Sequence, residues 1–407
     1  MVITANEAQV KWKGLNEILF QYQSLWKLKP FEYFQIPWQE SYPELANWLL
    51  TISDHHLKVL SRDAEQLNLS VYQFLPEIRE LDHQTQLLFN DRKPIQNFQK
   101  LKKGVRGRKW QQIVGFVECL PLLESPVLEW CSGKAHLGRL ISEAQCLKVS
   151  SLEKNPDLCL AGNKISEVLK IPVNISQVDV LSEAVFENIP RHSHIVALHA
   201  CGMLHHRLLN ILKQSDINGI SLSPCCYHRM NDDYYSCFSS YARDNHLLKL
   251  NKHDLHLPLQ DVVVASDRTV KLRQLETRYR LAFDVFQRDV TGSNSYLTVP
   301  SVPNHILEGG FKNFLKWASQ KYQFPMPNDE QLSEYEQQGK ARGFIFSRIE
   351  LIRYVFRRAL EVWLVLDMVI FLIESGYQTD VGLFCNKRDT PRNIIINANK
   401  RSQPLDN

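Results

Sequence analysis

The feature that most constrains the fold is an alternation of short apolar runs with amphipathic stretches between residues 126 and 230. The runs are VLEW, CLKVSSLE, VNISQVDV, HIVALHA and GISLS, and amphipathic stretches such as AHLGRLISEAQ and GMLHHRLLNILKQ lie between them. Strands that alternate with helices pair in parallel, because the helices cover the faces of the sheet. The pattern therefore predicts an α/β fold with a mostly parallel, Rossmann-like sheet.

The rest of the chain divides around this core. Residues 1–110 repeat apolar residues at helical spacing and predict a mainly helical N-terminal region, and 231–350 predict a mixed or helical insertion. The core then resumes over 351–400, after its first part at 111–230. There YQTDVGLF, the polar turn CNKRDTPRN and IIINA have the spacing of a hairpin. We expect the last strand to be antiparallel to its neighbour.

Cysteine usage and hydropathy indicate where the protein resides. Nine cysteines occur without a CxxC repeat, and the first residues, MVITANEAQVKWKG, lack an apolar core. The most apolar stretch, 362–377, is too short to span a bilayer and contains Asp367 and Glu374. We expect a cytoplasmic protein with free thiols and no membrane anchor. The net charge of +4 neither requires nor excludes an anionic partner.

The turn after the first predicted strand indicates the kind of cofactor. A dinucleotide fingerprint would place glycines at 131, 133 and 136, but the chain has Cys131, Gly133 and His136. S-adenosylmethionine has no pyrophosphate, so its turn needs fewer glycines. Glu129, Cys131, Gly133 and Ala135 form the pattern acidic-x-small-x-Gly-x-small, which suits this cofactor. Lys134 lies inside this turn, where it either reaches the methionine carboxylate or stays in solvent.

Two carboxylates after the next strands extend this hypothesis. Glu153 ends the second apolar run, twenty residues after Gly133, and an acid there can accept hydrogen bonds from two ribose hydroxyls. Asp179 follows the third run, where it or its backbone would meet the adenine edge. The alternatives are a solvated Glu153 and a helix-capping Asp179.

These motifs resemble those of class I S-adenosylmethionine-dependent methyltransferases, over about 110–230 and 350–400. The likeness is to a branch with an H-x-C-G element after the fourth strand, a CCYH-type element after the fifth and S/T-P-R-N before the last. Here these correspond to His199–Gly202, Ser223–His228 and Thr390–Asn393. The resemblance implies methyl transfer with S-adenosylmethionine as cofactor. The Asn/Asp-Pro-Pro-Tyr element of many amino-directed methyltransferases is replaced by His-Ala-Cys-Gly.

The carboxyl ends of strands four and five bring together a set of candidate catalytic residues. They are His199, Cys201, Cys225, Tyr227 and His228, and His199 is also a candidate cofactor contact. With Pro224 they are expected to form a pocket in which Tyr227 stacks on a base. The first interpretation of these residues is that they hydrogen-bond and position the substrate. The second is that a histidine acts as general base. Three further interpretations are covalent catalysis by a cysteine, cysteines with a purely structural role, and zinc binding by Cys201, Cys225, Cys226 and His228.

A basic stretch precedes the α/β core. KLKKGVRGRKW places six Lys or Arg between Lys100 and Lys109, and RYVFRR at 353–358 adds a second group. Phosphate binding is one interpretation and a solvated linker is the other. We therefore expect a methyltransferase that acts on RNA, either tRNA or rRNA, and find no indication of DNA. The alternatives are a protein or small-molecule methyltransferase and a non-catalytic binding module on the same scaffold.

Overall fold

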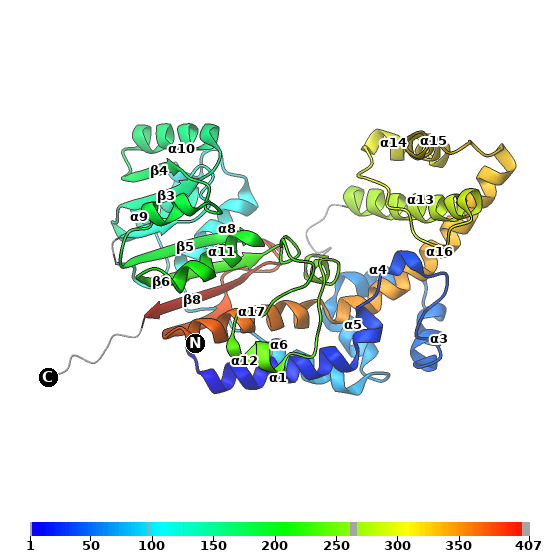
Figure 1. The fold of residues 1–407 in the computed structure, drawn as a ribbon, viewed down its shortest axis with the longest axis horizontal. Helices are drawn as coiled ribbons and strands as arrows, with labels where there is room; N and C mark the ends of the chain where they lie inside the picture. The colour runs from blue at the N-terminus through cyan, green and yellow to red at the C-terminus, as the bar shows by residue number, and fades with distance from the viewer. Residues whose placement is uncertain (1, 97, 125, 261–266, 401–407) are drawn as a thin grey trace. The chain divides into compact units, whose positions relative to one another are not determined.

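The computed structural model describes residues 2–96, 98–124, 126–260 and 267–400. Its strands form one eight-stranded sheet, ordered β1-β7-β8-β6-β5-β2-β3-β4 (Figure 1). The strands are β1 Val2–Ile3, β2 Val127–Glu129, β3 Val149–Glu153, β4 Val173–Gln177, β5 Ser193–Cys201, β6 Ile217–Cys225, β7 Tyr377–Leu383 and β8 Ile394–Lys400.

The pairing of the strands confirms the predicted α/β architecture. β2 pairs in parallel with β3 and with β5, β3 pairs with β4, and β5 pairs with β6 in the same sense. β8 is antiparallel to both of its neighbours, β6 and β7. The last strand therefore has the expected direction, and the chain reverses within the short turn between β7 and β8.

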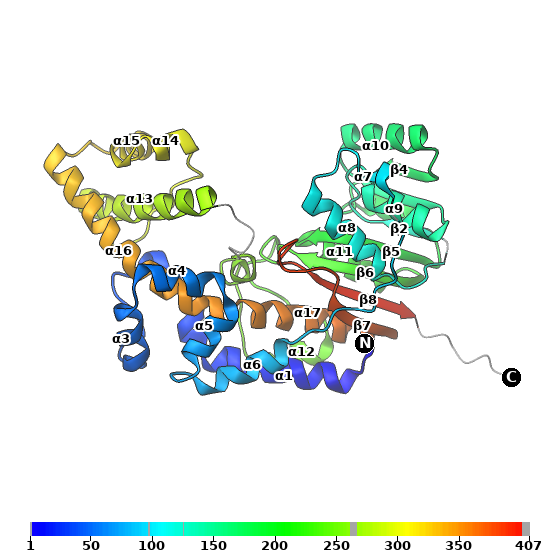
Figure 2. The ribbon, with the colours of Figure 1, turned by 180° about the vertical axis from the view of Figure 1, so that it is seen from behind.

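The helices of the core cover the sheet. They are α7 Gln99–Lys102, α8 Gly107–Glu118, α9 His136–Gln145, α10 Pro156–Leu169, α11 Met203–Leu212 and α17 Arg357–Glu374. α9 packs on β3 and β4 and contacts α7 and α8, whereas α11 packs on β5 and β6 (Figure 2). Phe116 of α8 and Leu140 of α9 share one buried apolar cluster with Val127 and Val149 of the strands. This burial orients α8 toward the carboxyl end of β2.

The N-terminal region is mainly helical, as predicted, but it begins with a strand that the sequence pattern did not reveal. Val2 and Ile3 form β1, which pairs with β7 at the edge of the sheet. A two-residue strand carries no periodicity, so only its pairing identifies it. The helices that follow are α1 Ala5–Gln21, α2 Gln23–Trp26, α3 Pro43–Thr51, α4 Asp54–Arg62, α5 Ala64–Val71 and α6 Arg79–Thr85.

Contacts divide the chain into two compact units. The first contains the sheet and comprises Met1–Phe20, Glu80–Asp261 and Arg358–Asn407, and the second comprises Gln21–Arg79 and Val262–Arg357. Part of the N-terminal region thus packs with much of the predicted insertion. The helices after β6 are α12 Ser240–Asn245, α13 Asp267–Thr291, α14 Asn304–Glu308, α15 Phe311–Tyr322 and α16 Asp329–Val355. Residues 261–266 of the predicted insertion lie outside the described residues.

The second unit is held together by close helix packing and by a buried ion pair. Gly339 allows α16 to approach α13, because a Cβ there would lie 2.4 Å from the Ala282 side chain. Arg342 of α16 donates to the Asp284 carboxylate at 2.5 Å, and both side chains are buried. Each charge thereby compensates for the desolvation of the other.

α17 is a buried helix of the first unit and contains most of the apolar stretch 362–377. Its Asp367 accepts hydrogen bonds from the Phe238 and Ser239 amides and from the Tyr235 and Ser239 hydroxyls. This carboxylate therefore fixes the chain that leaves β6. Among the helices that the structure describes, we find none with the length and apolarity needed to cross a bilayer.

Candidate active site

The strand order reverses at β2, which is where open α/β sheets have their ligand-binding crevice. β3 and β4 lie on one side of β2, and β5 and β6 lie on the other. Ligands of open α/β sheets bind at such a reversal, outside the carboxyl ends of the strands. The loops after β2, β3 and β4 form one side of this crevice, and the loops after β5 and β6 form the other.

The turn after β2 has a left-handed backbone although it contains only one glycine. The φ angles of Cys131, Gly133 and Ala135 are 54°, 58° and 52°. This conformation costs a residue with a side chain roughly 1–2 kcal/mol. The turn thus has the left-handed backbone that glycines usually provide. Two of its left-handed positions are nevertheless occupied by Cys131 and Ala135. Such strain persists only where the surrounding structure enforces it, which is typical of functional sites.

Buried Arg139 on α9 holds this turn in place. Its guanidinium donates to the Lys134 carbonyl at 2.5 Å, to the Gly162 carbonyl at 3.2 Å and to the Ser166 hydroxyl at 3.1 Å. It also lies 3.2 Å from Nδ1 of His136. Sequence analysis did not single out Arg139; the available signal is an arginine on the apolar face of an amphipathic helix.

Glu129 lies beneath the turn. Its carboxylate is buried and accepts hydrogen bonds from the Gly138 amide at 3.1 Å and the Ser151 hydroxyl at 3.0 Å. Burial raises the pKa of Glu129 to about 7, and hydrogen bonds to Ser151 and Gly138 and the charge of Arg139 limit the shift. The structure therefore shows Glu129 supporting the start of α9; contact with the cofactor remains a prediction.

Glu153 meets the turn at the end of β3. Its carboxylate accepts hydrogen bonds from the Gly133 amide at 2.8 Å and the Asn155 amide at 2.9 Å. The side chain is half-buried. A carboxylate can accept about four hydrogen bonds, so two places are left for ligand hydroxyls. A Cβ on Gly133 would meet nothing within 4 Å, so the space beside the turn is open.

Among the described residues, the side chains of Asp179 and Lys134 are not hydrogen-bonded to the turn as Glu153 is. Asp179 accepts a hydrogen bond from the Leu181 amide at 3.0 Å and forms an ion pair with Lys154 at 2.7 Å. The Asp179 carboxylate thus stabilises its own loop and does not cap a helix, because Ser182 is the residue that precedes the 3-10 helix Glu183–Asn188. An adenine contact remains a prediction. Lys134 is exposed.

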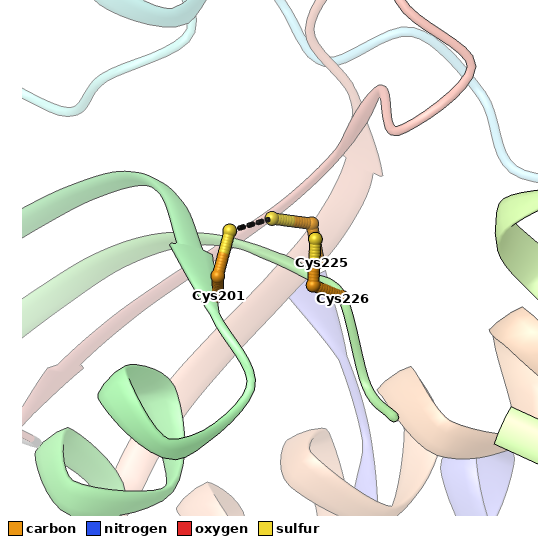
Figure 3. A group of neighbouring side chains, drawn as sticks. All are labelled: Cys201, Cys225 and Cys226. Carbon is orange, nitrogen blue, oxygen red and sulfur yellow. Dashed lines mark hydrogen bonds between the residues drawn. The ribbon is translucent and has the colours of Figure 1, made fainter. Parts of the chain in front are cut away.

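The other side of the crevice brings three thiols together. Cys201 and Cys225 end β5 and β6 and are partners in the register of these strands. Their sulfur atoms are 3.1 Å apart, and Cys226 completes a group in which all three sulfurs lie within 4.8 Å of one another (Figure 3). Cys225 is buried, whereas Cys201 and Cys226 are half-buried. The H-x-C-G and CCYH-type elements thus meet as predicted.

His199 sits on an irregularity of β5. The register with β6 shifts between Leu198 and Ala200, and the φ of His199 is 62°. A bulge of this kind redirects a side chain. Nε2 of His199 lies 3.0 Å from Oε1 of the Gln112 side-chain amide, so Nε2 carries the proton and Nδ1 keeps a lone pair. Burial lowers the pKa of His199 to about 3, with Lys109 and Arg392 adding to the shift.

The expected pocket needs one correction. Tyr227 is buried, and its ring packs against the ring of His205 with the centroids 5.8 Å apart. The prediction that Tyr227 stacks on a substrate base is therefore wrong for this arrangement, because its ring belongs to the core. Pro224 is buried as well, and half-buried His228 packs against His256.

Lys109 of α8 places a positive charge beside this site. Its side chain contacts solvent, yet desolvation by the surrounding protein lowers its pKa, while Glu129, Cys225 and Cys201 oppose that shift. Sequence analysis counted Lys109 only as part of the basic stretch.

Gln112, one helical turn further along α8, connects three segments. Besides its contact with His199, it donates to the Asp389 carbonyl at 2.7 Å. Asp389 precedes Thr390–Asn393, so the turn between β7 and β8 also reaches the site. Sequence analysis missed Gln112, because a glutamine on a helix carries no signal until its partners are known.

The basic stretch itself lies on the surface. Lys100, Lys102, Lys103 and Arg106 are exposed, and none of them forms an ion pair with a carboxylate of a described residue. The second basic group differs. Arg353 is buried and pairs with Glu350, and Arg358 pairs with Glu361. The ion pairs of Arg353 and Arg358 therefore argue against RYVFRR as a second phosphate-binding group, and Arg357 lies over the Tyr354 ring.

An open depression of about 970 Å³ lies at the opposite edge of the sheet. Its walls include Val149 and Ser150 at the start of β3, Val173 and Asn174 at the start of β4, and Leu160 of α10. Parallel α/β proteins bind ligands at the carboxyl ends of their strands. This depression is therefore not the candidate active site.

Comparison with known proteins agrees with this geometry. Residues 108–233 match the model of a methyltransferase domain family. The matched segment extends from α8 past β6 and so contains both sides of the crevice. The chain thus carries a methyltransferase domain, and this domain implies an enzyme of the S-adenosylmethionine-dependent methyltransferase class. No curated protein and no solved structure matches the chain significantly.

Proposed function

We propose that this protein binds S-adenosylmethionine in the crevice beside β2 and transfers its methyl group to RNA, either tRNA or rRNA. The observation that carries the choice of RNA is the course of α8. This helix begins within the exposed basic stretch, and its Lys109 and Gln112 lie at the site where Gln112 contacts His199. An RNA backbone held by Lys100–Lys109 would place a nucleotide beside the H-x-C-G and CCYH-type elements of the branch that the sequence resembles.

The cofactor would lie against the turn after β2. The Glu153 carboxylate already accepts hydrogen bonds from two backbone amides, and its remaining lone pairs would accept hydrogen bonds from the ribose hydroxyls. Cys131, Gly133 and Ala135 would leave room for the methionine part, and Lys134 and Asp179 are the other proposed contacts. When bound, S-adenosylmethionine supplies a methyl group that its sulfonium already activates.

The chain would then mainly position the nucleophile. A pKa of about 3 makes His199 a weak proton acceptor at neutral pH, so positioning through its Nδ1 lone pair is favoured over general base catalysis. Cys201, Cys225 and His228 would border the same space. We propose a cytoplasmic location, which the nine free thiols support.

A cofactor titration of the purified full chain tests the first half of this proposal. Replacing Glu153 by Ala should weaken binding of S-adenosylmethionine by about 1–3 kcal/mol, because two ribose hydrogen bonds are lost. Glu167→Ala, at an exposed position of α10, is the matched control and should bind like the wild type. Equal affinity of a folded Glu153→Ala protein would remove this assignment.

RNA binding at several salt concentrations tests the second half. Changing Lys102, Lys103, Arg106 and Arg108 to Gln should weaken binding and lower the slope of log K against log salt by about 0.7–0.9 per lost phosphate contact. The control changes four exposed lysines away from the site, Lys148, Lys164, Lys170 and Lys213, and so alters the net charge equally. Cofactor affinity should stay unchanged in both variants. Without salt-sensitive RNA binding by the wild type, a protein or small-molecule substrate, or a binding module without catalysis, replaces the RNA proposal.

A further inference from the structure

We propose that Cys201, Cys225 and Cys226 bind a zinc ion through their three thiolates. This inference does not depend on the proposed RNA substrate. The three residues come from two elements, with Cys201 at the end of β5 and the neighbouring cysteines at the end of β6 (Figure 3). Thiolates are the preferred soft ligands of Zn²⁺ in structural sites, and a tetrahedral geometry is the rule.

The distances fit a single ion. A Zn–S bond of about 2.3 Å in a tetrahedral site separates two sulfurs by roughly 3.8 Å. Here the Cys201 and Cys225 sulfurs are 3.1 Å apart, and no two of the three are separated by more than 4.8 Å. Small side-chain rotations therefore reach the required spacing. A cubane 4Fe–4S cluster needs its thiolates further apart, because each one binds a different iron.

The backbone shows why two adjacent cysteines can serve one ion. Successive residues of a strand point to opposite faces of the sheet, so Cys225 and Cys226 would normally diverge. The chain leaves the strand at Cys226 in a left-handed conformation, with φ at 51°. The Cys226 sulfur thereby faces the other two (Figure 3). A residue with a side chain keeps this conformation at a cost, which a bound ion would offset.

The surroundings match the charge of such a site. Three thiolates around Zn²⁺ leave one net negative charge, and the positive charges of Lys109 and Arg229 lie close enough to act on these cysteines. Within the described parts of the chain, no fourth His, Cys, Asp or Glu belongs to this group. The fourth position is therefore open to water or to a substrate atom. On binding, Cys201 would lose the proton that it shares with the His199 carbonyl at 3.4 Å.

Metal analysis of the full-length protein, purified under reducing conditions and dialysed against zinc and then buffer, tests the proposal. We expect about one zinc per chain, and X-ray absorption should show three sulfur ligands at about 2.3 Å. The absorption measurement needs no variant and so is independent of folding defects. Cobalt exchanged into the site should give the sulfur-to-cobalt charge-transfer bands of thiolate coordination.

Serine substitutions then locate the ion. Cys201→Ser, Cys225→Ser and Cys226→Ser should each reduce zinc content severalfold at equal free zinc, whereas Cys146→Ser and Cys237→Ser should retain it. Cys146 is exposed and Cys237 is buried, so these controls match both environments. The site would be overturned by a wild type without zinc or by equal zinc binding in all five variants. A Cys201–Cys225 disulfide that persists after purification under reducing conditions would overturn it as well.

Discussion

The two sides of the crevice beside β2 are built in different ways. On the first side, the side chains of Glu129, Arg139 and Glu153 are hydrogen-bonded to the turn and helix that follow β2. On the second side, after β5 and β6, several buried side-chain polar atoms have no hydrogen-bond partner among the described residues. These are Oγ of Ser223, the Tyr227 hydroxyl, Nδ1 of His228 and Nε2 of His205, whereas on the first side the turn contributes Oγ of Ser132.

The first side is therefore a preformed binding surface, whereas the second side contains hydrogen-bonding groups that have no partner in the part of the chain that the structure describes. Both sides contain residues with side chains in the left-handed conformation, such as Cys131 on the first and His199 on the second. On the first side several side-chain hydrogen bonds hold the turn, whereas His199 on the second side is held by its hydrogen bond with Gln112. Buried polar groups in folded proteins are nearly always satisfied, so the unpaired atoms make the second side the less completely hydrogen-bonded of the two. The turn after β2 should therefore be rigid without any ligand.

The largest expected effect comes from removing the support of the first side. Arg139→Met should lower the free energy of unfolding by about 4 kcal/mol, because the Lys134 and Gly162 carbonyls lose a charged, buried donor. Chemical denaturation measures this change, and a titration should show weaker cofactor binding as well. Arg268→Met is the control, since its ion pair with Glu308 is exposed and should contribute less than about 1 kcal/mol. Similar losses in both variants would show that the turn does not depend on Arg139.

The pH dependence of the unfolding free energy tests whether the Glu129 carboxyl on the first side of the crevice is buried. Its pKa is raised by burial from 4.5 to about 7, so the native state favours the protonated acid. The corresponding stability is fully present below pH 4.5 and is lost as the pH rises to about 7.

Glutamine at position 129 cannot ionise and should not lose this stability. The unfolding free energy of Glu129→Gln, relative to the wild type, should thus rise by about 3 kcal/mol across that window and stay level above it. Glu167→Gln provides the control and should show a constant difference. A constant difference for Glu129→Gln as well would mean that its carboxylate ionises normally in the folded protein.

The smallest effect concerns the backbone of the turn. Gly133→Ala should destabilise the protein by about 1 kcal/mol, because its φ of 58° disfavours a side chain although the added Cβ meets no atom. Gly107→Ala is a close control, since the space around it is also open but its φ is not in the left-handed region. Thermal or chemical unfolding separates the two. If both substitutions have the same effect, the left-handed turn is not maintained in solution.

The sequence predicted the elements of the sheet better than the contacts of the site. VLEW, HIVALHA and GISLS lie in or overlap β2, β5 and β6, because apolar periodicity and secondary structure follow from the same local geometry. Arg139, Gln112 and Lys109 were missed or undervalued, since the function of each depends on partners from other elements. Tyr227 was placed in an open pocket, although packing against His205 buries its ring. An aromatic residue beside two cysteines has no sequence signal that separates these outcomes.

The sequence by itself determined the α/β class, the antiparallel last strand and the positions of the motifs at the ends of strands, because these depend on patterns within short segments. The tertiary structure decided which motifs meet. Cys201 and Cys225 become neighbours through the register of β5 and β6, and Gln112 reaches His199 because buried apolar residues orient α8. The register and the packing depend on the burial of residues far apart in the chain. A pattern within one segment therefore cannot specify these contacts.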